Sequence, residues 1–370
     1  MRIGLVIGTR PEIMKNYSVV RALREAGMDF MVLHTNQHQD PLMRDDIFSK
    51  MGYEPDFIYP GNYSMGAAID WVCKLIRQHH IDLVLVNGDT AASLIGAIAA
   101  IYSDVELGHI EAGLRSFDEQ MYEERNRVMV DSAAHYLFAY TRHHADYLSK
   151  INDLRGKIFN VGNTTIDLIE DFSPELSRMD SGRYAYITLH RKEFTDSRDR
   201  MVKVFAALNT LAQEFDAMIF PMHPRTRTAI AQHRLGQELL SRVRVIDPVD
   251  PFTSLSYEKY ADLIITDSGC IQEEAYIFGV PCVTVRENTE RPETIAAGAN
   301  ILTGFTIEKI LHLSRSQRVN RQRRFPPVYG TWGAGRRIVR ILQEIAMKRS
   351  RLTQSGSMSS QYSADFQVID

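Results

Sequence analysis

The stretch RIGLVIGTRPE (residues 2–12) contains the pattern from which the whole chain is built. A short apolar run ends at Gly8-Thr9, and the helix-like segment Pro11–Ala26 follows it with apolar residues every three or four positions. A continuous apolar strand followed by an amphipathic helix is typical of a parallel sheet covered on both faces. The apolar run is too short for the core of a signal peptide, so it predicts the first strand of a fold.

The same pattern of strand and helix recurs along the chain in two successive blocks. Apolar runs of strand length lie at 30–35, 81–89, 105–113 and 137–142, and again at 185–191, 217–224, 243–248, 262–269 and 280–286. At 370 residues the chain exceeds what one core supports. We therefore predict an α/β protein with two Rossmann-like doubly wound domains that face each other across a cleft. Ligands in such folds bind at the carboxyl ends of the strands.

The polar, proline-containing segment EDFSPELSRMDSGR indicates a domain boundary near residues 168–182. The prediction is a first domain at 1–168 and a second at 169–348, whose final helix (Gly335–Lys348) can pack back on the first domain. Residues 349–370 are rich in serine and glutamine without periodicity, so we expect a disordered tail there.

The composition excludes several classes of protein. With a formal net charge of -3, the protein lacks the overall positive potential that would attract nucleic acid or an anionic membrane surface. No window approaches the ~20 apolar residues of a membrane span. Cys73, Cys270 and Cys282 lack disulfide or metal-binding spacing, so free thiols in a reducing compartment are expected. These features predict a cytoplasmic protein.

Charged residues follow the first strands of the chain. Arg10 lies at the turn after the first strand, where backbone N–H groups favour anions, and Lys15 comes about one turn later. Asp89 ends the strand IDLVLVNGD. An aspartate just before a helix is commonly an N-cap, and this interpretation competes with a catalytic one.

Two further candidate carboxylates are among the acidic residues of HIEAGLRSFDEQMYEERNR (109–127). Glu111 lies at the mouth of the predicted sheet, and Glu123 lies four residues before Arg127 on an expected helix, so those two side chains share one face. A surface ion pair is the simpler interpretation of Glu123 and Arg127. Three carboxylates after two adjacent strands favour catalysis, because carboxylates close together raise one another's pKa and let an acid and a base coexist.

Histidines beside arginines end two strands of the second half. His190-Arg191 closes the run AYITLHR, and His223 closes AMIFPMHP ahead of an arginine. Such a pair is consistent either with structural histidines or with a phosphate or sugar contact. Metal binding is disfavoured because no cluster of ligands has the required spacing.

A glycine turn in ITDSGCIQEEA (265–275) is the sharpest local signal of the second half. Ser268-Gly269 lies between an apolar strand and a helix whose N-terminus suits a pyrophosphate. Glu273 and Glu274 lie one turn further on, where a carboxylate accepts hydrogen bonds from ribose, and Arg291 follows the next strand. Together these residues predict a nucleoside-diphosphate site.

Taken together, the motifs resemble the non-hydrolysing UDP-N-acetylglucosamine 2-epimerase family. The resemblance runs in family order through GTRPE, NGDT, GHIEAGLRS, EERNR, NVGNTTID, HRKE, TDSGCIQEEA and TERPE, over about 340 of the 370 residues. It implies a GT-B-like fold, a UDP-sugar substrate and a homodimer. It also implies an isomerase that inverts C2 of the sugar, giving UDP-N-acetylmannosamine for surface polysaccharides, without a redox cofactor or metal. The implied mechanism is anti elimination of UDP to a glycal, followed by re-addition with protonation from the other face.

The resemblance also implies roles for individual residues. Asp89, Glu111 and Glu123 are the expected proton-transfer set, with base and acid not assigned. The residues expected in catalysis are Lys15, Asp89, Glu111, Glu123, Arg127 and His190. Those expected to bind substrate or UDP are Arg10, Ser268, Gly269, Glu274 and Arg291, together with His223 on its strand-end position alone. Gln37, His38 and Arg191 resemble positions that bind a second UDP-GlcNAc as an allosteric activator in bacterial members.

The chain departs from the family pattern at several positions, and rival functions remain. Tyr122 stands where the family has proline, Cys270 where it has glycine and Thr331 where it has aspartate, and GNYSMG (61–66) lacks an arginine. The rivals are a 2-epimerase for another UDP-sugar such as a diacetamido-uronic acid, a hydrolysing epimerase, a GT-B glycosyltransferase and a non-enzymatic sugar-nucleotide sensor. The intact HIEAGLRS and TERPE motifs favour the non-hydrolysing branch.

Overall fold

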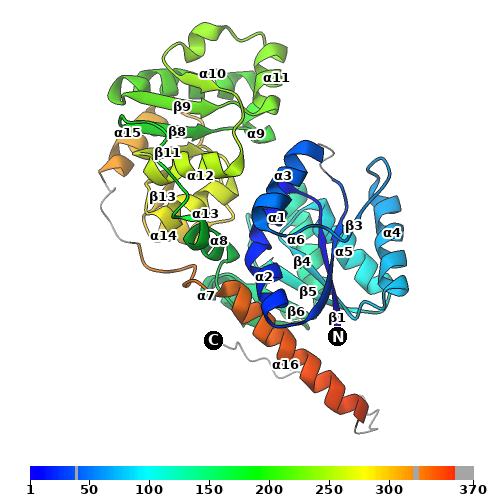
Figure 1. Cartoon of the computed structure of the whole chain (residues 1–370). Coiled ribbons are helices and arrows are strands. Elements are labelled where there is room, and N and C mark those ends of the chain that lie inside the picture. The colour runs from blue at the N-terminus through cyan, green and yellow to red at the C-terminus, as the bar shows by residue number, and fades with distance from the viewer. Residues whose placement is uncertain (38–40, 320–324, 355–370) are drawn as a thin grey trace. The chain divides into compact units, whose positions relative to one another are not determined.

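The computed structural model describes residues 1–37, 41–319 and 325–354. The chain forms two compact units (Figure 1). The first comprises Met1–Asp171 together with the chain from Pro327 onward, and the second comprises Phe172–Pro326.

The first unit is built on a seven-stranded sheet in the order β3-β2-β1-β4-β5-β6-β7, and every pairing is parallel. Side chains of β1 and β4 such as Val6, Val84 and Val86 are fully buried, which explains why these strands are continuous apolar runs. The strands are β1 (Arg2–Ile7), β2 (Asp29–His34), β3 (Phe57–Ile58), β4 (Leu83–Asn87), β5 (Glu106–Ala112), β6 (Tyr136–Ala139) and β7 (Lys157–Asn160).

Helices pack around this sheet (Figure 1). They are α1 (Arg10–Lys15), α2 (Tyr17–Glu25), α3 (Pro41–Met51), α4 (Met65–Gln78), α5 (Ala91–Tyr102), α6 (Tyr122–Ala133), α7 (Arg142–Leu148), α8 (Thr164–Phe172) and α16 (Ala334–Gln354). The helix expected over Pro11–Ala26 is divided at Asn16, the shared cap of α1 and α2. The Asn16 side chain donates to the Glu12 carbonyl (2.8 Å) and accepts from Asn87 (3.1 Å), so it ties the division to the end of β4.

The second unit repeats the design with a six-stranded parallel sheet in the order β10-β9-β8-β11-β12-β13. Its strands are β8 (Tyr184–Thr188), β9 (Ala217–Pro221), β10 (Arg244–Ile246), β11 (Leu263–Thr266), β12 (Cys282–Thr284) and β13 (Asn300–Leu302). Its helices are α9 (Lys192–Thr195), α10 (Arg198–Leu211), α11 (Pro224–Gln232), α12 (Pro251–Tyr260), α13 (Gly269–Phe278), α14 (Pro292–Ala296) and α15 (Ile307–Arg318), with short 3-10 turns at Ala212–Glu214 and Gln237–Leu240.

The predicted pair of doubly wound α/β units is confirmed by these strand orders. In each sheet the chain runs outward to one edge and then returns to continue on the other side of the first strand. The strand order therefore reverses between β1 and β4 in the first unit and between β8 and β11 in the second. Ligands of such sheets bind at these switch points, outside the carboxyl ends of the strands.

The last helix belongs to the first unit. The sequence had counted residues 169–348 with the second domain while expecting this helix to pack back on the first. The chain divides at Asp171, inside the boundary region predicted near 168–182, and returns to the first unit at Pro327. One cause is Asp167 on α8, whose buried carboxylate accepts the backbone N–H groups of Gly333 (2.6 Å), Ala334 (3.1 Å) and Gly335 (2.9 Å) at the start of α16. Helix α16 then packs on α2. Residues 349–354, expected in the disordered tail, continue this helix, and 355–370 lie outside the described residues.

Asp167→Ala is expected to lower the free energy of unfolding of the first unit by about 1–3 kcal/mol. The substitution removes the acceptor of three buried N–H groups and with it the cap of α16. Urea unfolding would measure the loss, with Glu170→Ala, an exposed site on the same helix, as the control. Equal curves for the two variants would show that α16 does not depend on this cap.

Across residues 1–37, 41–319 and 325–354, no helix has both the length and the apolar character needed to cross a bilayer.

Candidate active site

The turn between β1 and α1 is closed by a capping box. Thr9 is the N-cap of α1, and the side chain of Glu12 reaches back to the turn. Arg10 is the first residue of α1, with Pro11 in the first turn and Lys15 in the last. The turn thus brings one cation to the start of the helix and another to its end, as the sequence predicted.

Glu12 is a buried carboxylate that links this turn to the next one along the sheet. Its Oε2 accepts hydrogen bonds from Gly8 N (3.0 Å), Thr9 N (2.8 Å) and the Thr9 hydroxyl (2.8 Å). Its Oε1 accepts from the hydroxyls of Thr90 (2.7 Å) and Ser93 (3.4 Å), at the start of α5. The carboxylate therefore holds the turns after β1 and β4 together.

Glu12 is expected to make stability depend on pH. Burial raises its pKa from 4.5 to about 7, although the hydrogen bonds from Thr90, Thr9 and Gly8 oppose the rise. The folded state then binds this proton more tightly than the unfolded chain. The stability contributed by protonated Glu12 is full below pH 4.5 and is lost as pH rises through about 7, which amounts to ~3 kcal/mol.

The measurement is the free energy of unfolding of the wild type and of Glu12→Gln between pH 4.5 and 8. The wild type should lose stability relative to the variant as pH rises, because glutamine does not titrate. Glu54→Gln, at an exposed carboxylate, is the control. Curves for Glu12→Gln and wild type that stay parallel over this range would contradict the expectation.

Asp89 follows β4 but does not cap the next helix, which corrects one of the two interpretations of its position. The N-cap of α5 is Thr90, whose hydroxyl accepts from Ala92 N (3.1 Å) and Ser93 N (3.3 Å). The carboxylate of Asp89 instead pairs with Arg127 and is 23% exposed. An ionic partner and contact with solvent leave this carboxylate able to meet a ligand.

Glu111 lies near the end of β5, beside the Asp89 turn. Gly88 donates its N–H to the Ile110 carbonyl (2.9 Å), and a Cβ at Gly88 would lie 3.8 Å from the Glu111 carboxylate. The carboxylate pairs with Lys15 and is 2% exposed. Glu111 also has a positive φ of 71°, a conformation that is rare outside glycine and that clusters at functional sites.

Helix α6 presents Arg127 to these carboxylates, but its helical partner differs from the predicted one. Arg127 is 2% exposed and contacts Glu124 (2.9 Å), three residues earlier, whereas Glu123 is exposed in the first turn. Glu124 also accepts from Ser116 N (2.8 Å) and Phe117 N (3.2 Å), so it is a structural anchor of the loop before the helix. The simpler interpretation of Glu123 and Arg127 as a surface ion pair is therefore wrong.

In the second unit, the predicted histidines lie side by side. The rings of His190 and His223 stack with centroids 4.9 Å apart. Asp267 accepts the backbone N–H groups of His190 (2.7 Å) and Arg191 (2.8 Å), so it fixes the turn after β8 to the end of β11. Desolvation lowers the pKa of the His190 ring, although Asp267 opposes this. His223 caps α11 by accepting from Arg225 N (3.1 Å).

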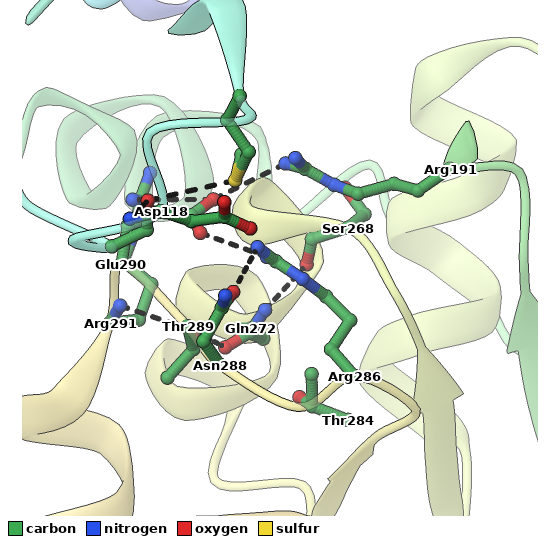
Figure 2. A network of polar contacts seen from close by, with 12 residues as sticks. Asp118, Arg191, Ser268, Gln272, Thr284, Arg286, Asn288, Thr289, Glu290 and Arg291 are labelled. Atoms are coloured by element: carbon green, nitrogen blue, oxygen red, sulfur yellow. Dashed lines mark hydrogen bonds and ion pairs between the residues drawn. The ribbon is translucent and has the colours of Figure 1, made fainter. Parts of the chain in front are cut away.

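Three guanidinium groups gather on Glu290 (Figure 2). Glu290 contacts Arg286 (2.8 Å), Arg191 (3.2 Å) and Arg291 (3.8 Å) and is 1% exposed. A Cβ at Gly269, the first residue of α13, would lie 2.5 Å from the Glu290 carboxylate. The absence of a side chain at Gly269 thus lets this carboxylate approach the helix N-terminus, where anions are favoured.

The two glutamates of α13 differ in their surroundings. Glu273 is fully buried and pairs with Arg291, which leaves Glu274 as the carboxylate of the pair that a ribose could reach. Glu274 is half-buried and lies near Glu258 on α12. Burial raises the pKa of Glu258 from 4.5 to about 7, although the hydrogen bond from the Ser254 hydroxyl (2.6 Å) opposes the rise. Ser268, the N-cap of α13, makes no side-chain capping bond.

Within each unit, the structure thus brings several of the predicted site residues close together. In the first unit Lys15, Asp89, Glu111 and Arg127 gather at the carboxyl ends of neighbouring strands, with Arg10 at the same edge. Gln37 lies beside Gly8, and His38 lies outside the described residues. Within residues 1–37, 41–319 and 325–354, no group of three or more His, Cys, Asp or Glu could hold a metal ion.

The sequence interpretation did not single out Glu124, Arg286 or the buried pair of His109 and Asp131. Arg286 ends the apolar run VPCVTVR, so the rule that selected Asp89 at a strand end would also have found it. Glu124 carried no signal of its own, because positions three and four residues from Arg127 are equally near on a helix.

Comparisons with known proteins agree on one family. A family model described as UDP-N-acetylglucosamine 2-epimerase matches residues 21–343. The chain is 37% identical to the UDP-N-acetylglucosamine 2-epimerase of Methanocaldococcus jannaschii, over 92% of this chain and 99% of that protein. It is 35% identical to the UDP-2,3-diacetamido-2,3-dideoxy-D-glucuronate 2-epimerase of Pseudomonas aeruginosa, over 93% of this chain and 100% of that protein.

A solved structure also resembles the chain. It is the crystal structure of the UDP-GlcNAc 2-epimerase of Methanocaldococcus jannaschii in complex with UDP-GlcNAc and UDP. Its TM-score is 0.81 at 36% identity, and the match covers 93% of this chain and 100% of that one. This likeness confirms the expected α/β, GT-B-like fold class.

Proposed function

The chain belongs to the UDP-N-acetylglucosamine 2-epimerase family, and we propose that it interconverts UDP-N-acetylglucosamine and UDP-N-acetylmannosamine without hydrolysis. The observation that carries this proposal is the gathering of Lys15, Asp89 and Glu111 at the carboxyl ends of the neighbouring strands β1, β4 and β5. Such carboxylates suit proton transfer to and from carbon.

The chemistry explains why more than one group is needed. The C2 proton of the sugar is not adjacent to a carbonyl, and general-base catalysis supplies only about 10²–10⁴-fold. A base therefore removes this proton while the C1–O bond breaks and UDP leaves with the electron pair, giving a glycal. UDP oxygen then attacks C1, and an acid delivers a proton to C2 from the opposite face. Elimination and re-addition conserve oxidation state, so the sequence of steps needs no redox cofactor.

We assign the proton transfers to Asp89, Glu111 and Glu123 in the first unit. Asp89 and Glu111 are supported by their cationic partners Arg127 and Lys15, and Glu123 is supported by its exposure at the start of α6. Such a cation holds a carboxylate in one orientation while it exchanges a proton. Arg10 is assigned to the substrate because it begins α1 at the same sheet edge.

Binding of UDP is assigned to the second unit. Arg291 and the N-terminus of α13 at Ser268-Gly269 suit the diphosphate, which must be stabilised as it departs. Glu274 suits the ribose hydroxyls because it is half-buried. His190 and His223 are assigned beside the diphosphate, since they stack at the carboxyl ends of β8 and β9.

The test is proton NMR of UDP-GlcNAc incubated with the purified protein in D₂O. UDP-ManNAc that carries deuterium at C2 would support the proposal. Free N-acetylmannosamine plus UDP would indicate hydrolysis and overturn it. If UDP-GlcNAc did not react and a UDP-diacetamido-uronic acid were epimerised, the latter would replace UDP-GlcNAc as the proposed substrate. This sugar is worth testing because the Pseudomonas relative is a UDP-2,3-diacetamido-2,3-dideoxy-D-glucuronate 2-epimerase.

We further propose a homodimer, a second UDP-GlcNAc as activator, and a cytoplasmic role in supplying surface-polysaccharide precursors. Exposed Ile101 and Tyr102 at the end of α5 and Val128 and Met129 on α6 support the dimer, because these two helices pack together. Sedimentation of the wild type against Tyr102→Glu would test it. Arg191, matched to the activator site, contacts Glu290. A reverse reaction that starts without any UDP-GlcNAc would argue against the activator.

A further inference from the structure

A row of buried polar groups lies beneath the two turns that carry Asp89 and Glu111. His109 on β5 contacts the Asp131 carboxylate on α6 through Nδ1 (2.6 Å) and the Gly88 carbonyl through Nε2 (2.9 Å). Arg115 contacts the other carboxylate oxygen of Asp131 (2.7 Å). His109 and Asp131 are fully buried, so water does not compete for these contacts. None of the catalytic roles assigned above uses this row.

The contact with the Gly88 carbonyl determines that Nε2 carries hydrogen. Burial by itself would raise the pKa of Asp131, but His109 and Arg115 outweigh it and hold that pKa below its usual range. Asp131 is therefore an acceptor, and the Gly88 carbonyl can only accept. Nε2 of His109 must then donate to the Gly88 carbonyl while Nδ1 contacts the Asp131 carboxylate, so the ring bridges a carboxylate and a backbone carbonyl.

The bridge connects the turn before Asp89 to the turn after Glu111. The Gly88 carbonyl and the Asp89 N–H belong to one planar peptide, so a hydrogen bond to that carbonyl sets the rotation from which Asp89 projects. Gly88 has a φ of 79°, and because glycine has no Cβ, its own sterics do little to restrain the orientation of this peptide. On the other side, Asp131 accepts the N–H of Gly113 (3.2 Å), two residues after Glu111.

We propose that His109 and Asp131 are positioning residues that set the geometry of Asp89 relative to Glu111. They touch no substrate atom themselves. The effect rests on the proposed epimerase function, because it acts through the two carboxylates assigned to proton transfer. A displacement of about 1 Å in such a group costs up to ~10²-fold in rate.

Two amide variants separate the two halves of the bridge. Asparagine at position 109 places an N–H near the position of Nδ1 and keeps the contact with Asp131, but it cannot reach the Gly88 carbonyl. Glutamine reaches further and keeps a donor for that carbonyl. We expect His109→Asn to lower kcat by roughly 10–100-fold with KM changed by less than about threefold, and His109→Gln to lose distinctly less. Melting temperatures and UDP affinity would show whether each variant is folded.

A purely structural role would give a different result. The two variants would then lose activity in proportion to their folded fraction, with kcat per folded molecule unchanged, and this outcome would overturn the proposal. A rise in KM at constant kcat would overturn it too.

Ring ¹⁵N NMR with labelled histidine gives a readout that does not depend on turnover. The His109 ring should show an N–H at Nε2, assigned by its absence in His109→Gln, and an Nε2 without hydrogen would contradict the bridge. If the wild type failed to epimerise UDP-GlcNAc, the proposed function would fall while this measurement would still test the bridge.

Discussion

Glu111→Gln is expected to lower kcat by roughly 10²–10⁴-fold while the affinity for UDP changes by less than about threefold. Glutamine keeps the shape of the side chain but cannot take or give a proton at neutral pH. Its amide oxygen still accepts a hydrogen bond from Lys15, the present partner of Glu111, so the fold of the turn should survive. The loss should therefore appear in the chemical step.

The measurement combines steady-state turnover with deuterium exchange at C2 in D₂O. Glu119→Gln is the matched control, since Glu119 is an exposed carboxylate in the loop that follows β5. If Glu111 acts in proton transfer, the exchange at C2 should fall together with epimerisation. Full exchange with lost epimerisation would mean that Glu111 acts only in the second proton transfer. Unchanged values of both would remove it from the mechanism.

Arg291→Met is expected to weaken UDP binding by roughly 10–100-fold, because a hydrogen bond to a charged group contributes about 1.5–3 kcal/mol. The same change should lower the free energy of unfolding by about 3–5 kcal/mol, since it leaves the fully buried Glu273 without its cation. The single variant thus mixes two effects that a second substitution can separate.

The double variant Arg291→Met/Glu273→Gln removes the uncompensated buried charge. It should recover most of the lost stability but none of the lost UDP affinity, as measured by urea unfolding and by calorimetric titration with UDP. Arg242→Met, at an exposed arginine of the same unit, is the control. Recovery of UDP affinity in the double variant would show that Arg291 supports the fold alone and does not meet the diphosphate.

The fold and the strand ends were predictable because they depend on short-range patterns. Continuous apolar runs followed by amphipathic segments predicted the parallel strands, and the sheets have them in the Rossmann order. The same patterns placed Asp89 and His190 after strands, as the structure has them, whereas Glu111, expected after its strand, is the second-last residue of β5. Residues at the ends of strands are good candidates for a site because the carboxyl ends of parallel strands all lie at one edge of a sheet.

Pairing between side chains was less predictable, because it depends on which face of a helix is buried. Glu123 and Glu124 are equally near Arg127 by sequence, yet only Glu124 turns inward to it. Likewise Glu273 pairs with Arg291 in the interior, while its neighbour Glu274 stays half-buried. Adjacent residues on a helix point in directions about 100° apart. Of two neighbouring glutamates, one can therefore be buried against an arginine while the other remains available to a ligand.

By itself, therefore, the sequence determined the class of fold, the strand ends that carry chemistry and the family that these motifs resemble. Each of these follows from residues near one another in the chain. Only the tertiary structure decided that α16 belongs to the first unit, that Glu12 joins two turns and that His109 bridges Asp131 to Gly88. These contacts join residues far apart in sequence. The packed interior excludes water, so each buried polar group must take its hydrogen-bond partner from the residues that folding brings beside it.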